Sequence, residues 1–182
     1  TKGGGAAGDK LVLTKAIGTG VILAGAMRGL HEAGAVGNCM ASMDTSNRQA
    51  MEILQAFGVK ALTDVTGFGL IGHLSEMLRT SSCGVELALA AVPVLPGALP
   101  LASLGVRSSI AQANAQALAD YQLAAELDPN ALALLSDPQT SGGLLACVAA
   151  DQVDGCIHAL TEAGIHGAVI GELKEASHWH IV

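Results

Sequence analysis

Short apolar runs along the chain predict buried strands. Residues 11–14, 144–148 and 168–173 are runs of four to six mostly apolar residues that lie next to glycine or polar turns. Runs of this length favour strands, because a helix that buries one face needs a longer repeating pattern. Residues 60–63 and 85–90 predict two more strands, and residues 178–182 a last strand or a tail.

Segments with the periodicity of amphipathic helices lie between these strands. One helix is predicted from the turn at residues 18–20 to about residue 31, and another from a cap at Asp44 or Ser46 through residue 55. A third opens at the glycine turn of residues 66–69, where Ile71, Leu74 and Leu78 recur at spacings of three and four. Residues 108–127 and 151–163 are further predicted helices.

One long uncharged segment interrupts this alternation. Residues 87–106 are apolar enough to suggest a membrane span. They also contain three prolines, Pro93, Pro96 and Pro100, which would break a spanning helix repeatedly. We therefore expect a strand followed by an irregular apolar connection.

The spacing of strands and helices predicts an α/β (α+β) protein, a layered sandwich in which helices pack against a mixed sheet. Hydrophobic residues make up 51% of the 182 residues, yet aromatic residues make up only 2%, so the core must consist of Ala, Leu, Val and Ile. This length suits one domain. We assign residues 11–182 to it and residues 1–10, rich in glycine and alanine, to a linker or disordered terminus.

The net charge and the cysteine pattern limit the classes of partner and compartment that fit this sequence. A net charge of −7 with only nine Lys and Arg argues against nucleic acid as a partner, because such binding draws on clustered basic residues. The four cysteines form no Cys-x-x-Cys pair, which favours buried reduced thiols in a cytoplasmic protein. No signal-peptide pattern occurs. The absence of an initiator Met before Thr1 suggests a fragment or a processed chain.

The turn after the strand at residues 60–63 carries the first candidate chemistry. Asp64 precedes Gly67 and Gly69, and the following helix would direct its first N–H groups toward the turn. Helix N-termini bind anions, and a carboxylate beside one can hold Mg²⁺ against a phosphate. An equally open interpretation is that Asp64 caps the helix and the glycines only make a tight turn.

Two further turns have a similar composition. Residues 137–143 combine Asp137, the hydroxyls of Thr140 and Ser141, and the pair Gly142 and Gly143, whose amides could form an anion-binding nest. An ordinary loop, stabilised by Asp and Ser side chains, is the more common explanation for this composition.

The third turn lies near the start of the chain. Lys15 precedes the glycines at positions 18 and 20 and could reach a phosphate, or it could be a solvated lysine at the end of a strand. His73 lies one turn after the Asp64 turn, where a core or helix-surface role is more common than catalysis. Neither a Walker loop nor a Gly-x-Ser-x-Gly motif occurs in the sequence.

In this order, the three turns resemble selenophosphate synthetases, a family also called selenide, water dikinases. The resemblance rests on Leu-Thr-Lys-Ala-Ile-Gly-Thr-Gly at 13–20, Thr-Asp-Val-Thr-Gly-Phe-Gly-Leu-Ile-Gly-His at 63–73 and Ser-Asp-Pro-Gln-Thr-Ser-Gly-Gly-Leu-Leu at 136–145. Residues 43–50 also resemble the family, and the likeness extends from about residue 11 to 173. Ala16 stands where the family usually has proline.

The resemblance implies the carboxyl-terminal domain of the aminoimidazole ribonucleotide (AIR) synthetase-like superfamily. The family converts ATP, selenide and water to selenophosphate, AMP and phosphate. By its pattern Asp64 binds Mg²⁺, Thr66, Gly67 and Gly69 lie near the phosphates, and residues 137–143 form an edge of the active site.

The family's reactive Cys or selenocysteine and most of its metal-binding Asp residues belong to an amino-terminal ATP-binding domain. We therefore expect this chain to need that domain as a partner, to be inactive alone, and to be a homodimer when complete, with neither nucleic acid nor membrane as a partner. Two alternatives remain open: a stand-alone interaction module with the same fold and no catalysis, and a related ATP-dependent synthetase with another substrate.

Overall fold

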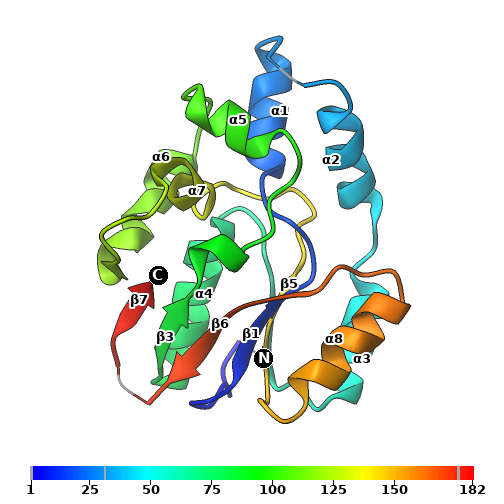
Figure 1. Ribbon diagram of the computed structural model, residues 1–182, viewed down its shortest axis with the longest axis vertical. Coiled ribbons are helices and arrows are strands. Elements are labelled where there is room, and N and C mark those ends of the chain that lie inside the picture. Colours follow the sequence, from blue (N-terminus) through cyan, green and yellow to red (C-terminus); the bar gives the residue numbers. More distant parts are fainter. Residues whose placement is uncertain (1, 31, 176) are drawn as a thin grey trace.

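The computed structural model describes residues 2–30, 32–175 and 177–182. It contains a seven-stranded sheet in the order β2-β5-β1-β6-β3-β7-β4 (Figure 1). The pairings are antiparallel except those that β7 makes with β3 and β4. The predicted mixed sheet is therefore confirmed. The strands are β1 Lys10–Leu13, β2 Ala61–Asp64, β3 Gly84–Leu87, β4 Gln122–Leu123, β5 Leu144–Val148, β6 Ala168–Lys174 and β7 Trp179–Ile181.

Alternation along the central strands separates two cores. Leu11 and Leu13 of β1 join the larger cluster, whereas Val12 between them faces the smaller one. In β5, Leu145 and Cys147 face the larger cluster and the residues at 144, 146 and 148 the smaller. Since successive side chains of a strand point to opposite faces, one continuous apolar run serves two cores.

Helices cover both faces of this sheet. The α-helices are α1 Thr19–Met27, α2 Ala35–Asp44, α3 Arg48–Ala56, α4 Gly69–Ser81, α5 Ala98–Ser103, α6 Ala111–Asn114, α7 Pro129–Leu134 and α8 Val153–Glu162. Helices α3 and α8 pack side by side over the smaller core, and α4 contributes its apolar face to the larger one. In Figure 1, α1, α2 and α5 stand beyond the ends of the central strands.

Residues 108–127 were predicted to form one helix, and this prediction was wrong. The structure has the four-residue α6, the 3-10 helix η2 Ala115–Asp120 and strand β4 instead. Only Ala111 and Tyr121 of this segment are buried. A helix in a protein draws most of its stability from a packed apolar face, which this stretch lacks.

Several other short elements of the structure also differ from the predictions. The apolar segment predicted to be irregular contains α5 and the 3-10 helix η1 Leu89–Ala91. Helices α2 and α7 were not predicted, and α1 ends at Met27, two residues before Gly29 at φ 72°. Asp44 ends α2 and does not cap α3, while the Ser46 hydroxyl accepts a hydrogen bond from Arg48 N at 3.2 Å.

The residues before β1 lie beside the end of β6. Residues 2–9 contain neither helix nor strand, and Gly8 N donates to Leu173 O at 2.8 Å. The boundary drawn at residue 10 stays a prediction. Within the described ranges, every helix is too short or too polar to cross a lipid bilayer.

Candidate functional site

Strand order brings the three candidate turns to one end of the sheet. Strand β5 lies between β2 and β1 and is antiparallel to both, so its beginning lies beside their ends. Leu144 pairs with Asp64, and its carbonyl accepts a hydrogen bond from Thr14 N at 3.0 Å. Val65 N donates to Gly143 O at 2.8 Å. Residues 14–18, 65–69 and 136–143 therefore meet at this edge.

Asp64 is the last residue of β2, and its side chain is exposed. In the described part of the chain its carboxylate has neither an ion-pair nor a hydrogen-bond partner. No cluster of three His, Cys, Asp or Glu exists among the described residues that would hold a cation alone. Asp64 thus fits one arm of a magnesium site, because Mg²⁺ commonly binds one or two carboxylates together with substrate phosphates.

Thr66 continues this turn and contacts a buried histidine. Its Oγ lies 3.2 Å from Nε2 of His73, which is 4% exposed. His73 Nδ1 lies 3.3 Å from Glu76 Oε2, but without hydrogen-bond geometry, so we treat this contact as electrostatic only. Burial lowers the pKa of His73 despite the opposing effect of Glu76. A neutral His73 therefore orients the Thr66 hydroxyl from behind the turn.

The two glycines of the turn differ in their surroundings. Gly69 has φ 70°, and a Cβ there would lie 2.8 Å from Leu135 O. Gly67 is exposed, and a Cβ there would have no atom within 4 Å. Gly69 therefore permits close backbone packing, whereas Gly67 leaves room for a ligand.

Two backbone amides at the start of α4, where an anion was predicted to bind, make hydrogen bonds within the protein. Gly69 N donates to Thr66 O at 3.0 Å, and Ile71 N donates to Leu135 O at 3.0 Å. These two amides are bound within the protein. Only the first N–H groups of α4 that lack such a partner stay candidates for binding an anion, because the carbonyl of Leu135 occupies the amide of Ile71.

Asp137 faces inward, away from the open side of the turn. It is 2% exposed, and its Oδ2 accepts hydrogen bonds from Val21 N at 3.0 Å and Gln139 Nε2 at 3.1 Å. Burial raises its pKa to about 6, although these donors, Gly20 N and Arg107 oppose the rise. Its Oδ1 lacks a partner with hydrogen-bond geometry. This carboxylate thus anchors the first turn of α1 and is not placed to bind a ligand at the Asp64 edge.

The remainder of the turn is divided between exposed and buried residues. Thr140 and Ser141 are exposed, and Ser141 Oγ donates to Met43 O at 2.7 Å. Gly142 and Gly143 are buried, and a Cβ at Gly143 would lie 2.5 Å from the backbone nitrogen of residue 15. The burial of these two glycines favours the ordinary-loop interpretation, and the amide nest stays a prediction.

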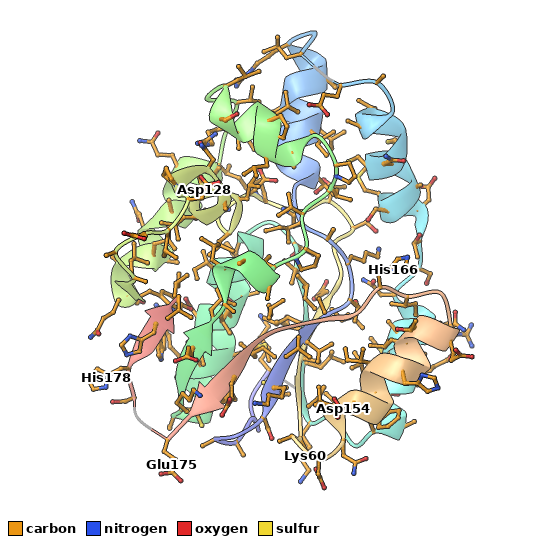
Figure 2. The ribbon with its side chains drawn as sticks, viewed as in Figure 1. Lys60, Asp128, Asp154, His166, Glu175 and His178 are labelled. Carbon is orange, nitrogen blue, oxygen red and sulfur yellow. The ribbon has the colours of Figure 1, made fainter. Side chains whose placement is uncertain are left out.

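Lys15 connects two segments instead of facing the Asp64 turn. Its Nζ donates to Thr45 O at 2.6 Å and to Ser141 O at 2.9 Å. Burial lowers its pKa. It also lines a hollow of about 270 Å³ together with Asn47 and His166, and Figure 2 shows His166 on the connection between α8 and β6. The lysine therefore holds residues 141 and 45 beside the end of β1.

Two residues that the sequence analysis did not single out hold the turns together. Gln139 N donates to Thr66 O at 3.0 Å, and its side-chain Oε1 accepts from Gly18 N at 2.9 Å. Asn114 Nδ2 donates to Gly67 O at 2.8 Å and to Ser136 O at 3.1 Å. Gln139 lies in a predicted turn and Asn114 in a predicted helix. Their contacts depend on the turns coming together in the folded chain, so the sequence carried no signal of them.

Comparison with known proteins identifies the family of this chain. Residues 6–181 match the family described as AIR synthase related protein, C-terminal domain. The chain is 38% identical over 165 residues to a selenide, water dikinase of Carboxydothermus hydrogenoformans, covering 90% of this chain and 48% of that protein. It is 39% identical over 170 residues to the enzyme of the same name from Pelobacter propionicus, covering 92% and 49%. The chain thus spans about half the length of these relatives.

Solved structures support the fold. The hydrogenase maturation protein HypE of E. coli superposes with a TM-score of 0.68 at 21% identity, covering 97% of this chain and 46% of HypE. Thiamine-monophosphate kinase from Stenotrophomonas maltophilia gives 0.67 at 15% identity, covering 97% and 51%. A HypE structure in complex with ATP gives 0.62 at 20% identity, covering 94% of this chain and 44% of that one. At these identities the likeness establishes the layered α/β fold.

Proposed function

This chain belongs to the family of AIR synthase related proteins, C-terminal domain, and we propose that it is the carboxyl-terminal half of a selenophosphate synthetase. In this role it closes over ATP held mainly by an amino-terminal domain. The reaction would convert ATP, selenide and water to selenophosphate, AMP and phosphate. The relatives named selenide, water dikinase, each matched over nine-tenths of this chain, support the assignment.

The observation that carries the proposal is the exposed Asp64 carboxylate at the meeting point of the three turns. Its side chain has no partner among the described residues, although carboxylates elsewhere in the chain, such as Glu76 and Glu172, are paired. In the complete enzyme Asp64 would supply one oxygen ligand to Mg²⁺ at the ATP phosphates, and Thr66 and Gly67 would lie beside them. The ion offsets charge that develops on the transferred phosphoryl group.

Residues 137–143 support this edge without supplying ligands to the metal. Thr140 and Ser141 are its exposed members, while Asp137, Gly142 and Gly143 fix its position through buried contacts. The free, unbridged state of all four cysteines supports a reducing compartment such as the cytoplasm. The proposal also includes a homodimer for the complete protein.

Substitution of Asp64 by Asn in the full-length protein tests the proposal. The isostere keeps the shape of the side chain and removes its charge, so we expect selenophosphate formation to fall by about a thousandfold or more, as when a charged transition-state contact is lost. Asp154→Asn is the matched control, because Asp154 lies on α8, away from the turns (Figure 2).

Two measurements make the result decisive. The free energy of unfolding of the isolated chain should stay nearly unchanged in Asp64→Asn, since the carboxylate forms neither a hydrogen bond nor an ion pair with the described residues. Activity like that of the control, with Mg²⁺ dependence intact, would refute the metal role of Asp64. Loss of stability without a specific loss of turnover would also refute it.

A further inference from the structure

Two arginines line a groove that borders the turn of residues 136–143 and does not include Asp64. Two adjoining hollows, of about 340 and 450 Å³, share Arg28, Arg107, Ser108 and Ser109 as walls, and we call these four residues the arginine groove. Arg28 follows α1 and Arg107 follows α5, two helices that lie side by side at one end of the molecule (Figure 1).

Both arginines lack an acidic partner. Arg48 and Arg79, the other two arginines, form ion pairs with Glu52 and Asp120 at 2.9 and 2.7 Å. Within the described ranges no carboxylate lies in ion-pair distance of Arg28 or Arg107, and the walls of both hollows contain neither Asp nor Glu. An acidic chain thus leaves two positive charges unpaired at one place.

The hydrogen bonds of these guanidinium groups leave most donors unused. Arg28 Nη2 donates to Arg107 O at 3.1 Å. Arg107 Nη1 donates to Ala102 O at 2.6 Å and Val106 O at 2.7 Å, which fixes the side chain over the end of α5. A guanidinium has five N–H donors in a planar fork, so each group retains donors for a ligand.

Hydroxyl groups complete the lining. Ser108, Ser109 and Thr140 lie in the walls, and Ser136 lines the larger hollow. Ser136 is 1% exposed, and its Oγ has no hydrogen-bond partner in the described structure. A buried hydroxyl without a partner is uncommon in native proteins and is typical of a place where a ligand or water completes the bonding.

One charge opposes an anion here. Asp137 lies close enough to Arg107 for the arginine to lower its pKa, against the larger effect of burial. Its carboxylate, however, is 2% exposed and turned toward the start of α1. Because Asp137 is absent from the walls of both hollows, a ligand in the groove would contact the two arginines and the hydroxyls and not the carboxylate.

We propose that the arginine groove binds the phosphoryl group of a small phosphorylated molecule. Paired guanidinium groups with neighbouring hydroxyls recognise phosphate oxygens by charge-assisted, bidentate hydrogen bonds. The hollows are larger than a single anion requires and fall in the range of small-molecule sites, roughly 300–1,000 Å³. The groove takes the phosphoryl group without Asp64 or a metal ion, although it shares Ser136 and Thr140 with the turn that borders the Asp64 edge.

Calorimetric titration of the 182-residue chain without Mg²⁺ tests the proposal. The probes are inorganic phosphate, AMP and adenosine. We expect both anions to bind and adenosine not to bind, with the affinity falling as the ionic strength rises. If AMP binds more tightly than phosphate, the groove holds the rest of the nucleotide as well; equal affinities mean that only the phosphoryl group is recognised.

The variants assign the binding to these residues. Arg28→Gln should weaken AMP binding about tenfold or more through the loss of charge-assisted bonds, while Arg48→Gln, the same charge change elsewhere, should leave it unchanged. Arg107→Lys keeps the charge but loses the fork, and should weaken binding to a smaller extent. Asp64→Asn should bind AMP as the wild type does, which separates this test from that of the proposed function.

Two results would overturn the proposal. The first is the absence of binding for both phosphate and AMP at concentrations up to about 10 mM, which would mean dissociation constants above about 10 mM. The second is equal binding by Arg28→Gln and Arg48→Gln. Because Arg28 is exposed and bonds only to a neighbouring carbonyl, its substitution does not compromise folding.

Discussion

Gln139 Oε1 accepts hydrogen bonds from Thr19, at 3.1 Å from its backbone nitrogen and 3.2 Å from its hydroxyl. The same oxygen accepts from Gly18 N, and the Thr19 hydroxyl accepts in turn from Thr140 N at 2.8 Å. One buried amide thus joins the start of α1 to the turn before β5. The backbone nitrogen of Gln139 extends the connection to the Asp64 turn.

Gln139→Ala should destabilise the protein by about 2–4 kcal/mol, because two backbone N–H groups at the start of α1 lose their acceptor in a buried place. Chemical denaturation of the isolated chain measures this loss. Gln49→Ala serves as the control, since Gln49 is exposed on α3 and should change stability by less than about 0.5 kcal/mol. An equal effect of both substitutions would contradict the role of the Gln139 amide.

Asp137 should give the stability a distinct pH dependence. Its folded pKa of about 6 lies above the ordinary value of 3.8, so the folded state binds the proton more tightly than the unfolded state does. The contribution is therefore fully present below pH 3.8 and is lost as the pH rises through about 6. The loss is on the order of 3 kcal/mol at most.

Asp137→Asn isolates this contribution from those of other groups. Glu76 and Glu172, whose pKa values are lowered by lysines, act in the opposite direction in both proteins and cancel in the difference. The free energy of unfolding should fall less between pH 4 and pH 6.5 in the variant than in the wild type. Parallel pH profiles for the two proteins would show that the carboxyl group titrates normally.

Gly69 and Gly67 offer a matched pair of substitutions. Gly69→Ala should cost about 2–4 kcal/mol, because φ is positive and the new methyl group meets Leu135 O. Gly67→Ala should leave the free energy of unfolding nearly unchanged, since a Cβ there contacts nothing. In the full-length enzyme Gly67→Ala should still raise the KM for ATP, because the methyl group occupies the space that we assign to phosphate.

The outcomes for this pair can be separated experimentally. Thermal denaturation of both isolated variants gives the stability difference, and steady-state kinetics of the complete enzyme gives the KM. Equal stability of the two variants would contradict the close packing inferred at Gly69. An unchanged KM in Gly67→Ala would remove Gly67 from the neighbourhood of the phosphates.

Sequence patterns predicted the central strands well, because β1 and β5 are buried on both faces and appear as continuous apolar runs, and β6 places Ile170 and Leu173 in the larger core. They failed where tertiary contacts decide the structure. Strand β4 forms only because residues 122 and 123 pair with β7, and α7 depends on Asp128 capping a helix that begins with a proline. Figure 2 shows Asp128 at that helix start.

For the candidate site, too, the sequence predicted some residues well and others poorly. Exposed members such as Asp64 and Thr140 were identified from residue type and position in a turn. For the buried members the residue types left two interpretations open, and the contacts of Asp137 with neighbouring backbone favour the ordinary loop. The contacts of Gln139 and Asn114 join segments that are far apart in the sequence, by 121 residues between Gln139 and Gly18 and by 47 residues between Asn114 and Gly67.

The position of β5 between β2 and β1 has a consequence for biosynthesis. Asp64 and Thr14 leave the ribosome long before Leu144, which is their common partner at the end of the sheet. Until then β2 and β1 lack the strand that separates and aligns them, and the apolar residues of both are exposed. Such late, long-range pairing slows folding and leaves early segments open to misassembly. The domain should therefore acquire the Asp64 edge in a single late step of synthesis, which makes the segment from β1 to residue 143 the part of this domain most dependent on protection by chaperones.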